Sequence, residues 1–110
     1  MSNPIIHIIG LSCNPDMDDK LNKWYDKKHI PMVMRSKYVK EAKRYRRITD
    51  DEHYPKYLAV YMFDSKEDSD AYDASPDLVA NIKEAQETWK AGGPVEKARV
   101  HYELIKSFKK

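Results

Sequence analysis

The chain has 110 residues, of which 41% are hydrophobic and 35% charged, and its formal net charge is +2. This length suffices for one small domain and is too short for two, so we expect residues 1–110 to form a single domain. Acidic and basic residues are interspersed, which argues against the basic face of a nucleic-acid-binding protein.

The single cysteine, Cys13, cannot form an internal disulfide. The N-terminal sequence MSNPIIHIIG has no positively charged region, and its apolar run is shorter than a signal peptide or a membrane span requires. The sequence therefore predicts a cytoplasmic protein that has no membrane partner.

The first third of the chain predicts a strand and then a helix. Residues 4–12 are apolar and β-branched, as in a strand that is buried on both faces. Asn14 and Pro15 are typical of a helix start, with Asn14 as the cap. Pro31 lacks a backbone donor and restricts the residue before it, so we expect the helix to stop there and a short turn to follow over 31–35.

The remaining residues predict further strands and helices. The expected segments are a strand over 38–48, a loop over 49–55, a strand over 56–63, a short helix from Ser65, a helix from Ser75-Pro76 to Gly92 and a strand over 96–105. The order β-α-β-β-α-β is that of the ferredoxin-like α+β fold, which has an antiparallel sheet and helices on one face. Because the strands are apolar on both faces, we expect a second copy to cover the other face, as a homodimer that encloses a barrel.

Several motifs resemble one known group of proteins. WYDKKHIPMVM, RYRR, YPKYLAVYMFD and YELI are similar to sequences of EthD-like and related proteins of the dimeric α/β-barrel superfamily. The resemblance covers roughly Pro4 to Ile105 and implies the fold just described. It implies no particular reaction, because cyclases, isomerases, cofactor-free monooxygenases, haem-handling enzymes and stress-linked proteins share this fold.

His29 is the first candidate for a catalytic residue. It lies near the expected end of the first helix, where Asp26 and Tyr25 are three and four residues earlier and can reach the same side. Asp26 is the expected partner that orients the imidazole for acid–base catalysis. The alternative is that His29 only caps the last carbonyl groups of the helix. Trp24 and Tyr25 are expected to pack in the core and to support His29. Both are also candidates for substrate binding, Tyr25 through a hydroxyl that lines the pocket.

Two further sets of residues are candidates for ligand binding. Tyr57, Tyr61 and Phe63 share one face of their strand, which we assign to the barrel interior, while the aliphatic face is assigned to the helices. Ordinary packing at a dimer interface is the alternative. Arg44 can bind a carboxylate or an enolate if it points inward, and is a solvated charge if it points outward.

His7 interrupts an aliphatic strand, and His101 lies in the last strand. The first and last strands are neighbours in a ferredoxin-like sheet, so the two histidines can lie close together on the barrel side. Either they form a second polar cluster in a cavity, or His7 is a core histidine with a partner and His101 is unrelated to it. The second interpretation is favoured because buried polar groups usually find partners.

The sequence offers no metal-ligand spacing, no glycine-rich phosphate loop and no nucleophile-elbow serine, so no metal and no organic cofactor are expected. The resulting hypothesis is a small enzyme that binds an apolar or aromatic ring compound and uses His29 for a cyclisation, an isomerisation or a dehydration. The alternatives are a dimeric protein without catalytic activity that binds a ligand or is stress-associated, and a cofactor-free monooxygenase.

Overall fold

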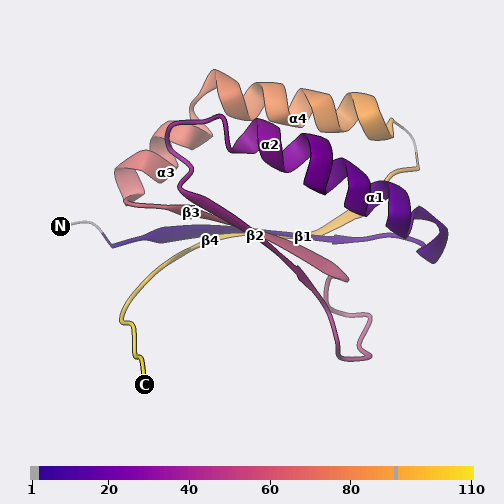
Figure 1. The fold of residues 1–110 in the computed structure, drawn as a ribbon, viewed down its shortest axis with the longest axis horizontal. Coiled ribbons are helices and arrows are strands. Elements are labelled where there is room, and N and C mark those ends of the chain that lie inside the picture. Colours follow the sequence, from indigo (N-terminus) through magenta and orange to yellow (C-terminus); the bar gives the residue numbers. More distant parts are fainter. Residues whose placement is uncertain (1–2, 91) are drawn as a thin grey trace.

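The computed structural model describes residues 3–90 and 92–110, which form an antiparallel sheet covered on one face by helices (Figure 1). The strand order is β2-β3-β1-β4. The strands are β1 (Ile5–Ser12), β2 (Glu41–Arg46), β3 (Tyr57–Phe63) and β4 (Val95–Glu103). This arrangement confirms the ferredoxin-like α+β fold expected from the sequence. The β2 strand is shorter at both ends than the predicted segment.

The helices come from two parts of the chain. Between β1 and β2 the helical segments are η1 (Pro15–Met17), α1 (Asp18–Trp24), η2 (Tyr25–His29) and α2 (Ile30–Val33), and between β3 and β4 they are α3 (Lys66–Asp73) and α4 (Pro76–Trp89). The side chains of Ser65 and Ser75 cap α3 and α4 by accepting bonds from backbone N–H groups. Across the described part of the chain, every helix is too short or too polar to cross a bilayer.

The prediction that the first helix stops before Pro31 is wrong. Residues 25–29 form a π-turn, in which the N–H of Ile30 bonds to the carbonyl of Tyr25, and helical geometry continues into α2. A proline inside an α-helix clashes with the carbonyl four residues earlier. The wider turn just before Pro31 leaves room for its ring, so the axis continues. The Asn14 side chain makes no capping bond at the start of this region, and its carbonyl accepts one from Met17 instead.

The two faces of β3 are assigned the wrong way round in the sequence-based prediction. Tyr57, Tyr61 and Phe63 are buried beneath the helices, whereas Leu58, Val60 and Met62 are half-buried on the opposite face. Strand alternation separates the two sets of residues but does not say which set meets the helices. The aromatic residues therefore belong to the core of one chain and not to a barrel interior.

Gly10 marks a local irregularity in β1. The pairing of β1 with β4 shifts register between Gly10 and Leu11. A Cβ atom at position 10 would lie 2.5 Å from Cγ of Pro55. The absence of a side chain thus lets the end of the β2–β3 loop approach the sheet closely.

Candidate functional site

A cavity of about 330 Å³ lies between the helices and the sheet. Residues on both layers line it, including five that the sequence predicts as site residues: His7, Trp24, Tyr25, His29 and Tyr61. His7 and Tyr61 belong to the sheet, and the other three belong to the helical segment that contains the π-turn. The cavity therefore lies inside one chain and not in a barrel between two chains.

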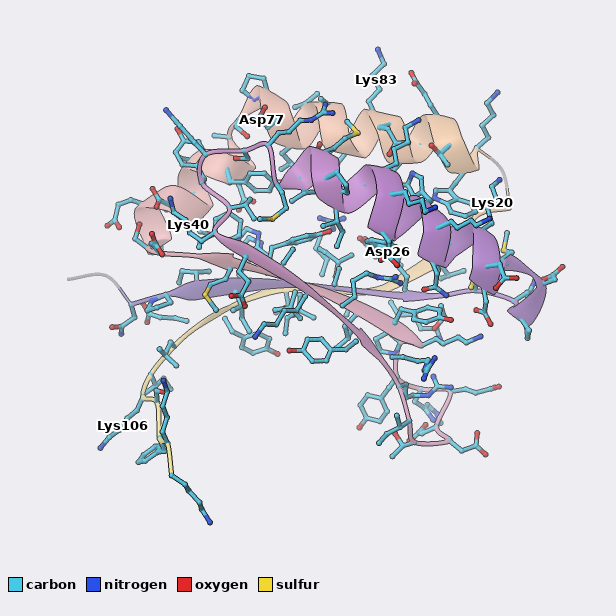
Figure 2. The ribbon with its side chains drawn as sticks, viewed as in Figure 1. Lys20, Asp26, Lys40, Asp77, Lys83 and Lys106 are labelled. Atoms are coloured by element: carbon cyan, nitrogen blue, oxygen red, sulfur yellow. The ribbon has the colours of Figure 1, made fainter. Side chains whose placement is uncertain are left out.

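Four other predicted site residues lie in the packing around this cavity and not in its wall. Arg44 does face the helices, but its guanidinium bonds to Asp26 at 2.9 Å and to Asn22 at 2.7 Å. Asp26 lies on the side of its helix that faces the sheet (Figure 2). Tyr57 donates a hydrogen bond to Asp18, and Phe63 is fully buried in the core. The contacts of these four residues join the helices to the sheet.

The carboxylate beside His29 belongs to Glu84 of α4. Nδ1 of His29 lies 3.7 Å from Oε1 of Glu84, too far for a hydrogen bond. Within the described part of the chain this buried Nδ1 has no hydrogen-bond partner. The imidazole stacks on Trp24 with ring centroids 4.4 Å apart. The expected pairing of Asp26 with His29 is thus replaced by a pairing with a residue of a different helix.

Glu84 is held in place by several donors. The indole N–H of Trp24 lies 3.0 Å from both carboxylate oxygens, the hydroxyl of Thr88 donates to Oε2, and the ammonium of Lys28 lies 3.7 Å from the same oxygen. Burial tends to raise the pKa of Glu84, but these bonds and nearby positive charges outweigh burial and lower it. Glu84 is therefore ionised at neutral pH.

Burial lowers the pKa of His29 below its usual value, and the negative charge of Glu84 only partly opposes this. His29 is consequently neutral at pH 7 and able to accept a proton. The imidazolium so formed would lie beside the Glu84 carboxylate and the face of the Trp24 ring. Both favour a positive charge. This combination is suited to a general base.

Two tyrosines in the cavity wall are hydrogen-bond donors at neutral pH. Burial raises the pKa of Tyr25 to about 12 and raises that of Tyr61 further. The hydroxyl of Tyr61 is buried and, among residues 3–90 and 92–110, has no partner. A buried donor without a partner is costly, so a ligand oxygen at this position would be favoured.

The two histidines of the outer strands are also in contact. His7 and His101 are directly opposite each other on β1 and β4, and their rings stack with centroids 3.5 Å apart. The predicted proximity is confirmed, but the pair lies on the helix side of the sheet. His7 also bonds to Ser69, so it has a partner, as the favoured interpretation expected. That interpretation is wrong in treating His101 as unrelated, because the two rings are in contact. Burial and then the charges of His101 and Arg99 lower the pKa of His7 to about 4.

Sequence reasoning missed Asp73 of α3 and Glu84 of α4. Glu84 immediately precedes Ala85, which recurs at helical spacing with Leu78, Ile82 and Trp89 and so marks the apolar face of α4. A carboxylate at the edge of an apolar helix face is a weak signal of a buried partner. The sequence does not identify that partner, because the contact joins residues more than fifty positions apart.

The fold and cavity define a small ferredoxin-like α+β domain with a ligand-sized space between its layers. The chain matches the family described as a domain of unknown function, DUF4286, over residues 4–90. Because this match covers most of the chain, the protein belongs to that family. A comparison with curated protein sequences finds no match.

Solved structures with the same fold include proteins of the group that the sequence resembles. An EthD family protein from Bacillus halodurans has a TM-score of 0.67 at 13% identity, covering 92% of this chain and 99% of its own. Hydroxynitrile lyase from Passiflora edulis has a TM-score of 0.71 at 15% identity, covering 99% and 100%. A protein from Bacteroides fragilis described as dimeric and ferredoxin-like has a TM-score of 0.60 at 19% identity, covering 92% and 96%. A cofactor-independent oxygenase is among the other matching structures. These neighbours establish the fold, and some of them are enzymes that act on small molecules.

Proposed function

We propose that the protein is an enzyme in which His29 removes a proton from a small cyclic or aromatic substrate bound in the cavity. The observation that carries the proposal is the buried Nδ1 of His29, which has no hydrogen-bond partner in the described residues and lies beside an ionised Glu84. The size of the cavity is at the lower end of the range for ligand pockets, which favours a small ligand.

The tyrosine in the sheet complements this base. Proton removal next to a carbonyl group places negative charge on the carbonyl oxygen, and a donor aimed at that oxygen stabilises the charge. Tyr61 is protonated at neutral pH and its hydroxyl has no partner among residues 3–90 and 92–110. We assign Tyr61 to the substrate oxygen and Glu84 to the stabilisation of the imidazolium. Removal of such a proton is the first step of isomerisation through an enolate, of aldol-type cyclisation and of dehydration next to a carbonyl group.

The test follows exchange of the α-protons of β-tetralone, a bicyclic ketone, for deuterium by NMR. The wild-type protein is expected to accelerate exchange over buffer, and His29→Gln is expected to remove the acceleration. His53→Gln is the matched control, because the side chain of His53 is 95% exposed on a loop. The proposal is wrong if His29→Gln retains the acceleration, or if the wild type accelerates exchange of neither β-tetralone nor a panel of related cyclic ketones.

We also propose that the protein is a homodimer joined through the open face of the sheet. All the helices lie on the other face (Figure 1). The open face carries half-buried aliphatic side chains, among them Val60 and Met62, and the more exposed Val100 and Tyr102. A contiguous apolar face of this kind favours a protein partner, and a second copy offers the same surface.

Light scattering after size exclusion tests this assignment. The wild type is expected to have the mass of two chains, and Val60→Glu is expected to shift it toward one chain. Val79→Glu is the control, because Val79 is an exposed valine on α4, in the opposite layer. A wild-type monomer at micromolar concentration, or a dimer unaffected by Val60→Glu, would contradict the assignment.

A further inference from the structure

The side chains of His7, His101 and Asp73 meet where β1, β4 and the end of α3 come together. The imidazole rings of His7 and His101 are parallel to within 1°, with centroids 3.5 Å apart. Oδ2 of Asp73 lies 3.7 Å from Nδ1 of His101. One ligand atom from each of the three residues can be chosen so that all lie within 4.8 Å of one another.

The distance between Asp73 and His101 is close to that between two ligand atoms of a metal site. Zinc–nitrogen and zinc–oxygen bonds of about 2.1 Å place neighbouring tetrahedral ligand atoms about 3.4 Å apart. The gap between Asp73 and His101 exceeds this by only a few tenths of an ångström and is too long for a hydrogen bond. To bring both nitrogens onto one ion, the stacked rings must turn well away from parallel, so metal binding requires the partly exposed side chain of His101 to change rotamer.

The residues around His7, His101 and Asp73 also favour metal binding. The hydroxyl of Ser69 lies 2.6 Å from Nε2 of buried His7 and fixes the orientation of that ring. Such a bond orients a histidine whose other nitrogen coordinates a metal. The side chains of His101 and Asp73 are 43% and 40% exposed, so an ion can enter from solvent. Arg99 lines the same cavity, and its ion pair with Glu96 offsets only part of the positive charge that it places near His7.

We propose that His7, Asp73 and His101 form a binding site for a divalent transition-metal ion of the Zn²⁺ class. Two imidazoles and one carboxylate are a ligand set that such ions accept, and three protein ligands leave a further coordination position free. All three residues line the cavity. An ion held by them would border the space assigned to the substrate and would act there as a Lewis acid on a substrate oxygen.

The test measures binding of Zn²⁺ and Co²⁺ to protein without a polyhistidine tag, after removal of metal with a chelator. Calorimetry is expected to show one Zn²⁺ per chain, and Co²⁺ is expected to give the visible absorption of a low-symmetry site. His101→Ala and Asp73→Asn are each expected to weaken Zn²⁺ binding at least about 100-fold, since loss of an outer-shell partner alone typically costs 10–100-fold. Both residues are partly exposed, so both variants should fold.

His53→Ala and His29→Gln are the controls and are expected to leave Zn²⁺ binding unchanged. The proposal is overturned if the wild type shows no saturable Zn²⁺ binding, or if binding persists unchanged in both His101→Ala and Asp73→Asn. In the first case the three residues form only a polar cluster, and in the second the ion binds elsewhere. Because no substrate is present, this result is independent of the role proposed for His29.

Discussion

Glu84 on α4 faces His29 across the interface between two helices, with Oε1 and Nδ1 3.7 Å apart. The contact couples the charge of a carboxylate fixed by Trp24 and Thr88 to the proton affinity of an imidazole in the cavity wall. The protonation state of His29 therefore depends on how α4 packs against the first helical segment.

Replacing Glu84 by Gln is expected to lower the pKa of His29 further. The amide keeps an oxygen that can accept from Trp24 and Thr88, but it removes the negative charge that favours the imidazolium. Chemical-shift titration of the His29 ring measures the change. Glu87→Gln, on an exposed position of the same helix, is the control and should leave the pKa of His29 unaltered. An unchanged pKa of His29 in Glu84→Gln would mean that the charge of Glu84 does not affect protonation of the imidazole.

Burial of neutral His29 predicts a dependence of stability on pH. The folded state holds the pKa of His29 below its unfolded value, so between these two values the unfolded state binds more protons. The contribution of neutral His29 to the free energy of unfolding should therefore be complete above about pH 6.5. It should fall as the pH drops below that value, by at most about 1.4 kcal/mol per pH unit for one group. Urea unfolding between pH 7.5 and 5 measures this slope, which should be shallower in His29→Gln. An equal slope in the variant would show that other groups account for it.

Tyr57 and Tyr61 lie on the same face of β3 and should respond differently to loss of their hydroxyls. Tyr57 donates to Asp18 and accepts from Asn22, so Tyr57→Phe is expected to cost about 1 kcal/mol of unfolding free energy. The Tyr61 hydroxyl has no partner in the described residues, so Tyr61→Phe should leave stability unchanged or raise it. Urea unfolding of both variants checks this. If Tyr61→Phe were the more destabilising change, its hydroxyl would have to be satisfied by bound water.

Tyr61→Phe should in contrast slow the β-tetralone exchange reaction, by a factor of about 100 if its hydroxyl binds the developing oxyanion. Tyr57→Phe provides the matched comparison, since Tyr57 lies outside the cavity wall. Equal rates in the two variants would remove Tyr61 from the mechanism while leaving the role of His29 open to its own test.

A methyl group at position 10 should destabilise the protein. In Gly10→Ala the new Cβ would lie 2.5 Å and 2.8 Å from ring carbons of Pro55, so either the β2–β3 loop or β1 must move. We expect a loss of about 1–3 kcal/mol in the free energy of unfolding. The double variant Gly10→Ala, Pro55→Ala should recover part of this loss, and urea unfolding of all four forms gives the coupling. If the effects of the two changes on the free energy of unfolding were additive, contact between residue 10 and Pro55 would not be the source of the strain.

The fold could be predicted from the sequence because each strand and helix carries a local signal. Ser65 and Ser75 cap helices as expected, and the order of elements makes the first and last strands neighbours, which brings His7 beside His101. These conclusions need only local patterns and a known chain topology.

The candidate site could be predicted only in part. Asp26 and Tyr25 are near His29 in sequence, but the carboxylate that faces its ring comes from α4, whose rotation and position depend on tertiary packing. Tertiary packing also decides which face of β3 meets the helices, because the alternation of side chains along a strand does not distinguish its two faces. Asp73 likewise joins the histidine pair only through the placement of α3.

The π-turn at residues 25–29 has a consequence for the engineering of this chain. A turn of this kind contains one residue more than the regular helix, so deletion of Lys27 or Lys28 would restore an uninterrupted α-helical repeat. The tryptophan and the histidine would then be four residues apart, a spacing at which two side chains still share one face of an α-helix. The room for the ring of Pro31 would be lost, because the carbonyl four residues before the proline would again lie against it. Such a deletion would therefore keep the indole and the imidazole on one side of the helix and would cost stability at the proline.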